Sequence, residues 1–182
     1  MRELNRISLI IGQRGTGKTT FGLQLVNASQ LKKKLIIDTF EHPSYKDFET
    51  ITASQLPRWI KGKKRILYRT DEDMDMINEY VYNTLIVMED CTKYLTGDLK
   101  QNIKSILFDS KQKNNDIIMM YHGFSFIPPK ILANCTDITL FKIGENINNH
   151  KGKIPSFETI LKAHQAIQAS SNIYERKTII VN

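Results

Sequence analysis

The sequence has few of the features that hold small secreted or membrane-bound proteins together. Only two of its 182 residues are cysteines, Cys91 and Cys135, and they are not closely paired as in a zinc or redox motif. No apolar run approaches the ~18 residues that cross a bilayer, and no secretory signal is visible. Internal repeats and low-complexity segments are also lacking. These absences argue against a disulfide scaffold, a membrane span or a repeat array. We expect a soluble protein of a reducing, intracellular compartment.

What is present fits an ordinary globular chain. Hydrophobic residues make up 41% of the sequence and charged residues 25%. A chain of this length buries a sizeable core without metal or disulfide support. We therefore expect residues 1–182 to form a single domain, with residues 150–182 as a C-terminal helix and strand extension.

Positive charge is in excess and unevenly distributed. The net charge is +7. Lys and Arg minus Asp and Glu give 14 − 5 = +9 for residues 1–70, 3 − 9 = −6 for residues 71–110, and 9 − 5 = +4 for residues 111–182. The basic runs are Lys32–Lys34, Lys61 with Lys63–Arg65, and Lys151 with Lys153, and we expect them in or beside turns. Such runs could contact a polyanion such as nucleic acid, although a solvated surface accounts for them equally well.

Short apolar runs alternate with segments of helical periodicity along the chain. Strands are predicted over Arg6–Ile11, Leu35–Thr39, Arg65–Arg69, Leu85–Met88, Ile117–Tyr121, Ile138–Ile143 and Tyr174–Val181. Helices are predicted over Lys18–Asn27, about Tyr45–Thr50, Asp71–Tyr82 with Asp71 as cap, Leu99–Phe108, a turn after Pro129, and Ser156 as cap to about Ser171. Continuous apolar strands separated by helices indicate the three-layer α/β plan: a mostly parallel sheet with helices on both faces.

One motif stands between the first strand and the first helix. The pattern G-x-x-x-x-G-K-[ST] is matched in full by Gly12, Gln13, Arg14, Gly15, Thr16, Gly17, Lys18 and Thr19, with Thr20 next. Glycines let backbone N–H groups wrap a phosphate, and the helix N-terminus adds positive potential. Lys18 is expected to reach the β- and γ-phosphates and Thr19 to bind Mg²⁺. The motif predicts a P-loop that binds ATP with Mg²⁺.

A pair of carboxylates follows the fourth predicted strand. The apolar residues Leu85–Met88 are followed directly by Glu89 and Asp90, at the carboxyl edge of the sheet where ligands of such sheets bind. Glu89 is expected to hold the Mg²⁺ shell and Asp90 to orient and deprotonate the attacking water. The pair therefore favours a hydrolase of the additional-strand type. Solvated acids at a strand end are the alternative.

These segments together resemble a known family. The P-loop GQRGTGKTT, the strands LIIDTFEHPSY and LIVMED, and the block SKQKNNDIIMMYHGFSFIPPKILANCTDITLFKIGEN resemble the HerA/FtsK superfamily of DNA-pumping ATPases, whose compact members include viral genome-packaging ATPases. The resemblance covers roughly residues 6–145. It implies a RecA-like P-loop NTPase fold with an additional strand (the ASCE type).

Position by position, the resemblance implies that Lys18 and Thr19 contact the phosphates and the magnesium ion. It also implies that Glu89 and Asp90 are the acidic pair. His122 falls at the polar sensor position after the fifth strand, where the family usually has an amide or hydroxyl; it could touch the γ-phosphate or the attacking water. The acids stand in the order Glu-Asp, whereas the family usually has Asp-Glu. That departure leaves their division of labour open.

A cation acting in trans on a neighbour's nucleotide is also implied by the resemblance. Lys111 stands where the family commonly has Arg, and a lysine lacks the bidentate grip of a guanidinium. Arg14, Arg69 and Lys142 are the other candidates. The sequence does not choose among the four.

The resemblance implies a motor that hydrolyses Mg-ATP to move double-stranded DNA. Its expected partners are DNA, further copies in a homo-oligomeric ring of five or six, and a capsid or other assembly component. Its expected place is the host cytoplasm, or association with the virion. The alternatives are a filamentous-phage-type assembly or secretion ATPase, a small-molecule kinase, and a nucleotide-gated switch without turnover.

Overall fold

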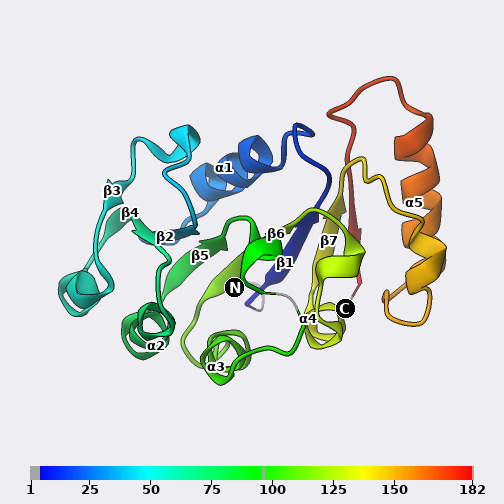
Figure 1. Cartoon of the computed structure of the whole chain (residues 1–182). Helices are drawn as coiled ribbons and strands as arrows, with labels where there is room; N and C mark the ends of the chain where they lie inside the picture. Colours follow the sequence, from blue (N-terminus) through cyan, green and yellow to red (C-terminus); the bar gives the residue numbers. More distant parts are fainter. Residues whose placement is uncertain (1–4, 96, 182) are drawn as a thin grey trace.

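One mixed sheet of eight strands runs through the protein (Figure 1). The structure, a computed structural model, describes residues 5–95 and 97–181; the ends of the predicted domain, at 1 and 182, lie outside them. The strand order is β3-β4-β2-β5-β6-β1-β7-β8. The strands are β1 Ile7–Ile11, β2 Lys33–Asp38, β3 Glu49–Thr50, β4 Gly62–Leu67, β5 Thr84–Met88, β6 Asp116–Tyr121, β7 Asp137–Leu140 and β8 Lys177–Ile180.

The strand order places an extra strand between the two motif-bearing strands. β6 pairs in parallel with both β1, which precedes the P-loop, and β5, which precedes the acidic pair. All neighbouring strands are parallel except β7 and β8, which pair antiparallel. Parallel strands end at the same edge of a sheet, so the segments after β1, β2, β5 and β6 meet there. The predicted α/β fold of the additional-strand type is confirmed.

Helices cover both faces of the sheet, as predicted (Figure 1). The helices are α1 Lys18–Ala28, α2 Asp71–Tyr80, α3 Gln101–Phe108, α4 Pro129–Asn134 and α5 Phe157–Ala169. In Figure 1, α1 lies on one side of the sheet and α2, α3 and α4 on the other. Alternate residues of the central strands β1, β2, β5 and β6 serve two separate cores: Ile10 packs on the α1 side and Leu9 on the other. Continuous apolar strands are required because neither sheet face meets water.

The segment after β2 does not form the predicted helix over Tyr45–Thr50. It forms a short 3₁₀ turn, η1 (Pro43–Tyr45), and then β3. Tyr45 and Phe48 are buried on the α1 side of the sheet, with their rings 5.6 Å apart in edge-to-face contact. Glu49 and Thr50 form β3, which pairs with β4. Tertiary burial and edge pairing therefore override the local pattern.

Of the two predicted helix caps, one is confirmed in position and the other is wrong by one residue. Thr70, not Asp71, precedes α2, and the carboxylate of Asp73 accepts hydrogen bonds from the backbone N–H groups of Arg69 and Thr70. Ser156 does precede α5, but its φ is +50° and its side chain makes no capping bond. Asp73 lies one turn into α2, where a carboxylate can reach back to the N–H groups before the helix.

The C-terminal part adds one helix and one strand to the sheet edge. β7 ends at Leu140, before the predicted Ile143, and the chain then passes through α5 to β8. Phe157, Ile160 and Ile167 of α5 are buried as predicted. Among the described residues, no helix combines the length and the hydropathy that a membrane span requires.

Candidate nucleotide-binding and catalytic site

A cavity of about 360 Å³ opens at the carboxyl edge of the central strands. The segments that line it are the P-loop after β1, the turn after β2, the acidic pair after β5 and the end of β6. Its charged lining includes Lys18, Glu89, Asp90 and His122. The fold therefore brings segments from four separate places in the sequence to one cavity.

The P-loop is fixed to the sheet by backbone hydrogen bonds. The Gly12 N–H donates to the Tyr121 carbonyl at 3.1 Å, and the Gln13 N–H donates to the Lys142 carbonyl at 2.9 Å. A Cβ at Gly12 would lie only 2.6 Å from the Cβ of Phe141, so no larger residue fits there. Gly17 has a φ of +92°, a conformation that side chains other than glycine rarely adopt. These constraints explain why the loop needs glycine at both positions.

The Lys18 side chain lies folded along the loop. Its ammonium donates to the carbonyls of Gly12 at 2.7 Å and Gln13 at 3.0 Å, and it lies 3.3 Å from Nδ1 of His122. Burial lowers the pKa of Lys18 from 10.5 to about 8, against the opposing effect of the Glu89 and Asp90 charges. A half-buried cation held mainly by carbonyl oxygens is ready to exchange them for phosphate oxygens.

Glu89 is buried against the start of α1. Thr19 donates its hydroxyl to Oε1 at 2.6 Å, and Tyr45 donates its hydroxyl to Oε2 at 3.2 Å. Burial nevertheless raises the pKa of Glu89, and the Thr19 and Tyr45 hydrogen bonds only partly offset this. The carboxylate is thus the group of the acidic pair that lies next to the predicted magnesium ligand, Thr19.

Asp90 has a different environment from Glu89. Its φ of +48° is unusual for a residue other than glycine and turns the chain sharply after β5. Its Oδ2 lies 2.6 Å from the Lys93 ammonium. Its Oδ1 lies 3.1 Å from Nε2 of His122, yet among the described residues neither of these buried atoms has a hydrogen-bond partner with suitable geometry. These two atoms, from adjacent segments that line the cavity, therefore face each other without a well-aligned hydrogen bond.

His122 stands between Lys18 and Asp90. Its backbone N–H donates to Oγ1 of Thr92 at 3.1 Å, which fixes the turn after β6. Burial and the neighbouring Lys18 ammonium lower the pKa of His122. The imidazole is therefore kept neutral, with Nδ1 toward a cation and Nε2 toward a carboxylate. A neutral ring in that place can donate one proton to an acceptor in the cavity.

Sequence reasoning missed the contribution of the turn after β2. Asp38 is buried, and its carboxylate accepts hydrogen bonds from the backbone N–H groups of Phe40 and His42, at 3.1 and 3.0 Å. The same turn places the Tyr45 hydroxyl within hydrogen-bond distance of Glu89. Among the described residues, Thr39 Oγ1 is buried in this turn without a hydrogen-bond partner. The sequence did contain a signal for this contribution: the apolar residues 35–37 are followed by the polar residues Asp38 and Thr39, and β2 ends at the same edge of the sheet as β1 and β5.

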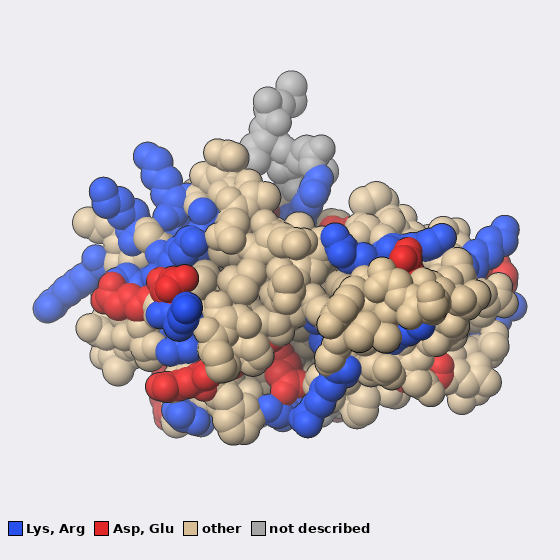
Figure 2. All heavy atoms as spheres, turned by 90° about the horizontal axis from the view of Figure 1, so that it is seen from above, with Lys and Arg blue, Asp and Glu red and all other residues tan. Residues whose placement is uncertain are grey.

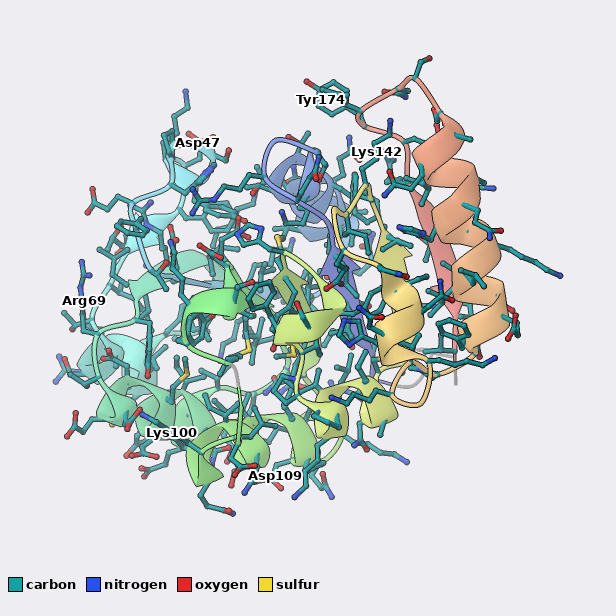
Figure 3. The ribbon with its side chains drawn as sticks, turned by 45° about the vertical axis from the view of Figure 1, so that its right-hand side comes forward. Asp47, Arg69, Lys100, Asp109, Lys142 and Tyr174 are labelled. Atoms are coloured by element: carbon teal, nitrogen blue, oxygen red, sulfur yellow. The ribbon has the colours of Figure 1, made fainter. Side chains whose placement is uncertain are left out.

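The four candidates for a trans-acting cation lie in different places. Arg14 is exposed in the P-loop at the cavity, and Arg69 projects from the periphery after β4 (Figure 3). Lys111 precedes β6 and so lies at the opposite edge of the sheet from the P-loop. Lys142 donates to the carbonyl of Ser170 and ties the chain after β7 to the end of α5. Lys142 is therefore a bracing residue in this arrangement.

The first two basic runs lie at the opposite edge of the sheet, in the bends before β2 and β4 and in the first residues of those strands. Lys32 precedes β2, and Lys63, Lys64 and Arg65 belong to β4. Arg65 is buried and donates to Oγ1 of Thr50, so it is structural. Lys and Arg side chains lie at both ends of the molecule in Figure 2, and those at the end that carries β2, β3 and β4 have acids among them.

The third basic run lies between η5 (Ile147–His150) and α5. Lys151 pairs with Glu158 at 3.4 Å, and its ammonium lies 5.6 Å from the centre of the Phe157 ring. Lys153 is exposed. This run is therefore separate from the other two and partly neutralised.

Solved structures share this arrangement of strands over the whole chain. The genome packaging NTPase B204 from Sulfolobus turreted icosahedral virus 2, in complex with sulfate, gives a TM-score of 0.77 at 14% identity over 100% of this chain and 94% of that chain. The chain has the fold of a viral packaging NTPase. The same NTPase in complex with ATP-gammaS gives 0.74 at 13% identity, with the same coverage. This agrees with the resemblance found in the sequence.

A second solved structure is less similar. The N-terminal domain of zonular occludens toxin from Neisseria meningitidis gives a TM-score of 0.55 at 12% identity over 98% of this chain and 95% of that chain. No protein-family model and no curated protein matches the sequence. The similarity of this chain to known proteins is therefore a similarity of three-dimensional fold, which persists at low sequence identity.

The residues present fit a magnesium ion that is shared with a nucleotide. Among residues 5–95 and 97–181, no group of three or more His, Cys, Asp and Glu could hold a metal by itself. Thr19 and Glu89 offer two adjacent oxygen ligands, and Mg²⁺ prefers sites in which waters and phosphates complete its octahedron. The unpaired oxygen of Asp90 lies beside them in the same cavity. The donor set suits Mg-nucleotide rather than a free metal ion.

Proposed function

We propose that the protein is a Mg²⁺-dependent ATP hydrolase. The observation that carries the proposal is the convergence of Lys18, Glu89, Asp90 and His122 on one cavity beside the P-loop. A P-loop alone would bind nucleotide. The acidic pair and the His122 imidazole beside Lys18 add what hydrolysis needs, a base and a donor for developing charge.

Each group has a role that follows from its surroundings. The P-loop N–H groups and Lys18 bind the β- and γ-phosphates, and Thr19 and Glu89 hold the ion. Mg²⁺, when bound, neutralises charge on the phosphate oxygens. Asp90 orients the attacking water and accepts its proton, and Nε2 of His122 donates to the γ-phosphate or that water. The pair in the order Glu-Asp thus keeps the roles that its two environments favour.

The simplest test is the substitution Lys18→Ala. We expect hydrolysis to be lost while the thermal melting curve stays near that of the wild type, because Lys18 contacts loop carbonyls and no core residue. ATPase rate and circular dichroism of the same preparation give the two readouts. Unchanged turnover in a folded variant would overturn the P-loop assignment.

We infer further that hydrolysis drives translocation of double-stranded DNA through a ring of five or six copies, as in genome packaging. The supporting observations are the excess positive charge, the basic runs at the start of β2 and β4, and a fold shared with a genome packaging NTPase. Sequence-independent binding to phosphates suits a pump that must accept any sequence. A capsid component would be the natural anchor for such a ring, and the host cytoplasm or the virion its place of action.

The structure selects the residues for a DNA test. Lys32 and Lys61 are exposed and adjacent, since the Gly62 N–H donates to the Lys32 carbonyl. Lys63 and Lys64 are less suitable, because they are bonded to Asn27 and Glu49. We expect Lys32→Gln with Lys61→Gln to weaken duplex binding and to reduce the salt slope by about 0.9 for each lost phosphate contact.

A matched control removes the same charge elsewhere. Lys130 and Lys162 are exposed on α4 and α5, and their replacement by Gln should leave DNA binding and DNA-stimulated hydrolysis unchanged. Binding is measured by fluorescence anisotropy at several salt concentrations, with assembly followed by mass photometry. An assembled ring that neither binds DNA nor responds to it would favour a protein-directed assembly ATPase instead.

A further inference from the structure

A second cavity adjoins the P-loop and has a different character from the first. It measures about 300 Å³ and shares no lining residue with the cavity that holds the acidic pair. Its lining is aromatic and polar: Phe21, Phe141, Tyr174, Arg176, Gln24 and the P-loop residues Thr16, Gly17 and Thr20. The P-loop therefore lies between a carboxylate-rich hollow and an aromatic one.

Tyr174 lines this second cavity and is exposed to solvent. Its side chain is 56% exposed, although it lies directly against the P-loop: a Cβ placed on Gly17 would be 3.3 Å from Cδ1 of Tyr174. Figure 3 shows Tyr174 projecting from the C-terminal segment, and its proximity to Gly17 places it at the start of α1. Among the other lining residues, the Arg176 guanidinium carbon lies 4.6 Å from the centre of the Phe21 ring. An exposed tyrosine ring in a lined hollow offers a stacking surface.

The segment that carries Tyr174 is held at both ends. Before it, the Ser170 carbonyl accepts from Lys142, and Asn172 accepts from the Tyr174 N–H at 2.9 Å. After it, β8 pairs antiparallel with β7. The same Lys142 residue accepts from the Gln13 N–H of the P-loop. The ring is thus positioned relative to the P-loop before any ligand arrives.

The positions of the two cavities determine how a bound nucleotide would be oriented. The terminal phosphate must face Glu89 and Asp90, because the groups for metal and water lie there. The remainder of the nucleotide must then leave the loop on a side where a planar, weakly polar group can be buried. Phe21, Phe141 and Tyr174 supply that surface, and Thr20 lines the passage from the P-loop to it.

We propose that Tyr174 stacks on the base of the bound nucleotide, so that the C-terminal segment 170–176 forms the nucleoside subsite together with the start of α1. This inference rests on the proposed binding of ATP and assigns the C-terminal extension a part in it. Tyr174 is a binding residue here, without a part in the chemistry. The phosphates are bound elsewhere, so the subsite is expected to affect nucleosides and not inorganic polyphosphate.

Binding of ATP and of inorganic tripolyphosphate by the full chain separates the two subsites. We expect Tyr174→Ala to weaken ATP binding by about fivefold to a hundredfold, the range measured for loss of one base–aromatic stack. Tripolyphosphate affinity should not change. Tyr174→Phe keeps the ring and should bind ATP as the wild type does. Tyr82→Ala is the matched control, because Tyr82 is 45% exposed and lies just before the start of β5, at the other sheet edge.

Photo-crosslinking with 8-azido-ATP gives an independent readout. We expect the modified peptide to contain Tyr174; modification of the Phe40 segment, which lines the first cavity, would overturn the subsite. Equal ATP affinity of the wild type and Tyr174→Ala would also overturn it while leaving nucleotide binding intact. If the wild type bound neither ATP nor tripolyphosphate, the proposed function itself would fail, and the subsite with it.

Discussion

Thr19 donates its hydroxyl to Oε1 of Glu89 at 2.6 Å, and this bond joins the P-loop helix to the end of β5 across the intervening strand. Both groups are oxygen ligands of the kind that Mg²⁺ prefers. Asp90, the next residue, makes no such contact and is directed instead to Lys93 and His122. The adjacency of Thr19 and Glu89 supports a division of labour within the acidic pair.

The two acids are expected to respond differently to loss of charge. Asp90→Asn should still bind Mg-ATP but hydrolyse it at least ~100-fold more slowly, the usual scale for loss of a general base. Glu89→Gln should instead raise the Mg²⁺ concentration needed for half-maximal binding. Magnesium titrations of ATP binding and single-turnover rates distinguish the two. The reverse assignment would follow if Glu89→Gln alone abolished turnover while its magnesium dependence stayed normal.

His122→Ala should separate chemistry from binding. The imidazole contacts Lys18 and Asp90 but no core residue of the sheet, so the fold should persist. We expect slower hydrolysis with ATP affinity close to that of the wild type. His122→Asn, which restores a polar donor, should recover part of the rate. Equal losses of rate and affinity would identify His122 as a structural residue.

ATP binding should weaken above about pH 8. Lys18 has a pKa of about 8 in the folded protein, and only its protonated form attracts phosphate. Bound phosphate favours the charged form, so binding near this pH should take up a proton, which calorimetry in buffers of different ionisation enthalpy measures. Lys18→Arg keeps its charge throughout and should lose this dependence. An affinity that stays constant from pH 7 to 10 in the wild type would contradict the assignment.

The same pKa shift acts in the opposite direction on the empty protein. Between pH 8 and 10.5 the folded state binds fewer protons at Lys18 than the unfolded state does. The contribution of Lys18 to the free energy of unfolding therefore increases as pH rises through that window. Urea titrations of the nucleotide-free wild type and of Lys18→Ala across this range provide the comparison.

Tyr45→Phe should destabilise the protein and disturb the magnesium site together. The change leaves Oε2 of Glu89 without its buried donor, which costs about 1–3 kcal/mol. Tyr121→Phe is the control, because Tyr121 is also buried and its hydroxyl donates to the Leu95 carbonyl at 3.3 Å, away from Glu89. Both variants should lower the urea midpoint, whereas only Tyr45→Phe should change the magnesium dependence. Identical magnesium titrations would show that Tyr45 serves packing alone.

The local sequence pattern was sufficient to predict most of the strands and the P-loop. Residues 117–121, and residues 7–11 apart from Ser8, are apolar runs, and such runs form buried parallel strands wherever both faces are covered. The order G-x-x-x-x-G-K-T between a strand and a helix likewise predicted the loop, because glycine is needed where a Cβ would clash, as at Gly12, or where φ is positive, as at Gly17. These features depend on neighbours in sequence, which a sequence displays directly.

Tertiary structure decided what lies next to what. Tyr45 was assigned to a helix because local spacing could not reveal that its ring is buried beside Phe48 and its hydroxyl bonded to Glu89, 44 residues away. Arg65 was counted in a basic surface run, although pairing of β3 with β4 buries it. Tyr174 reaches the P-loop only because β8 turns back antiparallel to β7. Sequence thus determined the elements and the phosphate loop, whereas the surroundings of each functional side chain depended on contacts between distant segments, which no local pattern encodes.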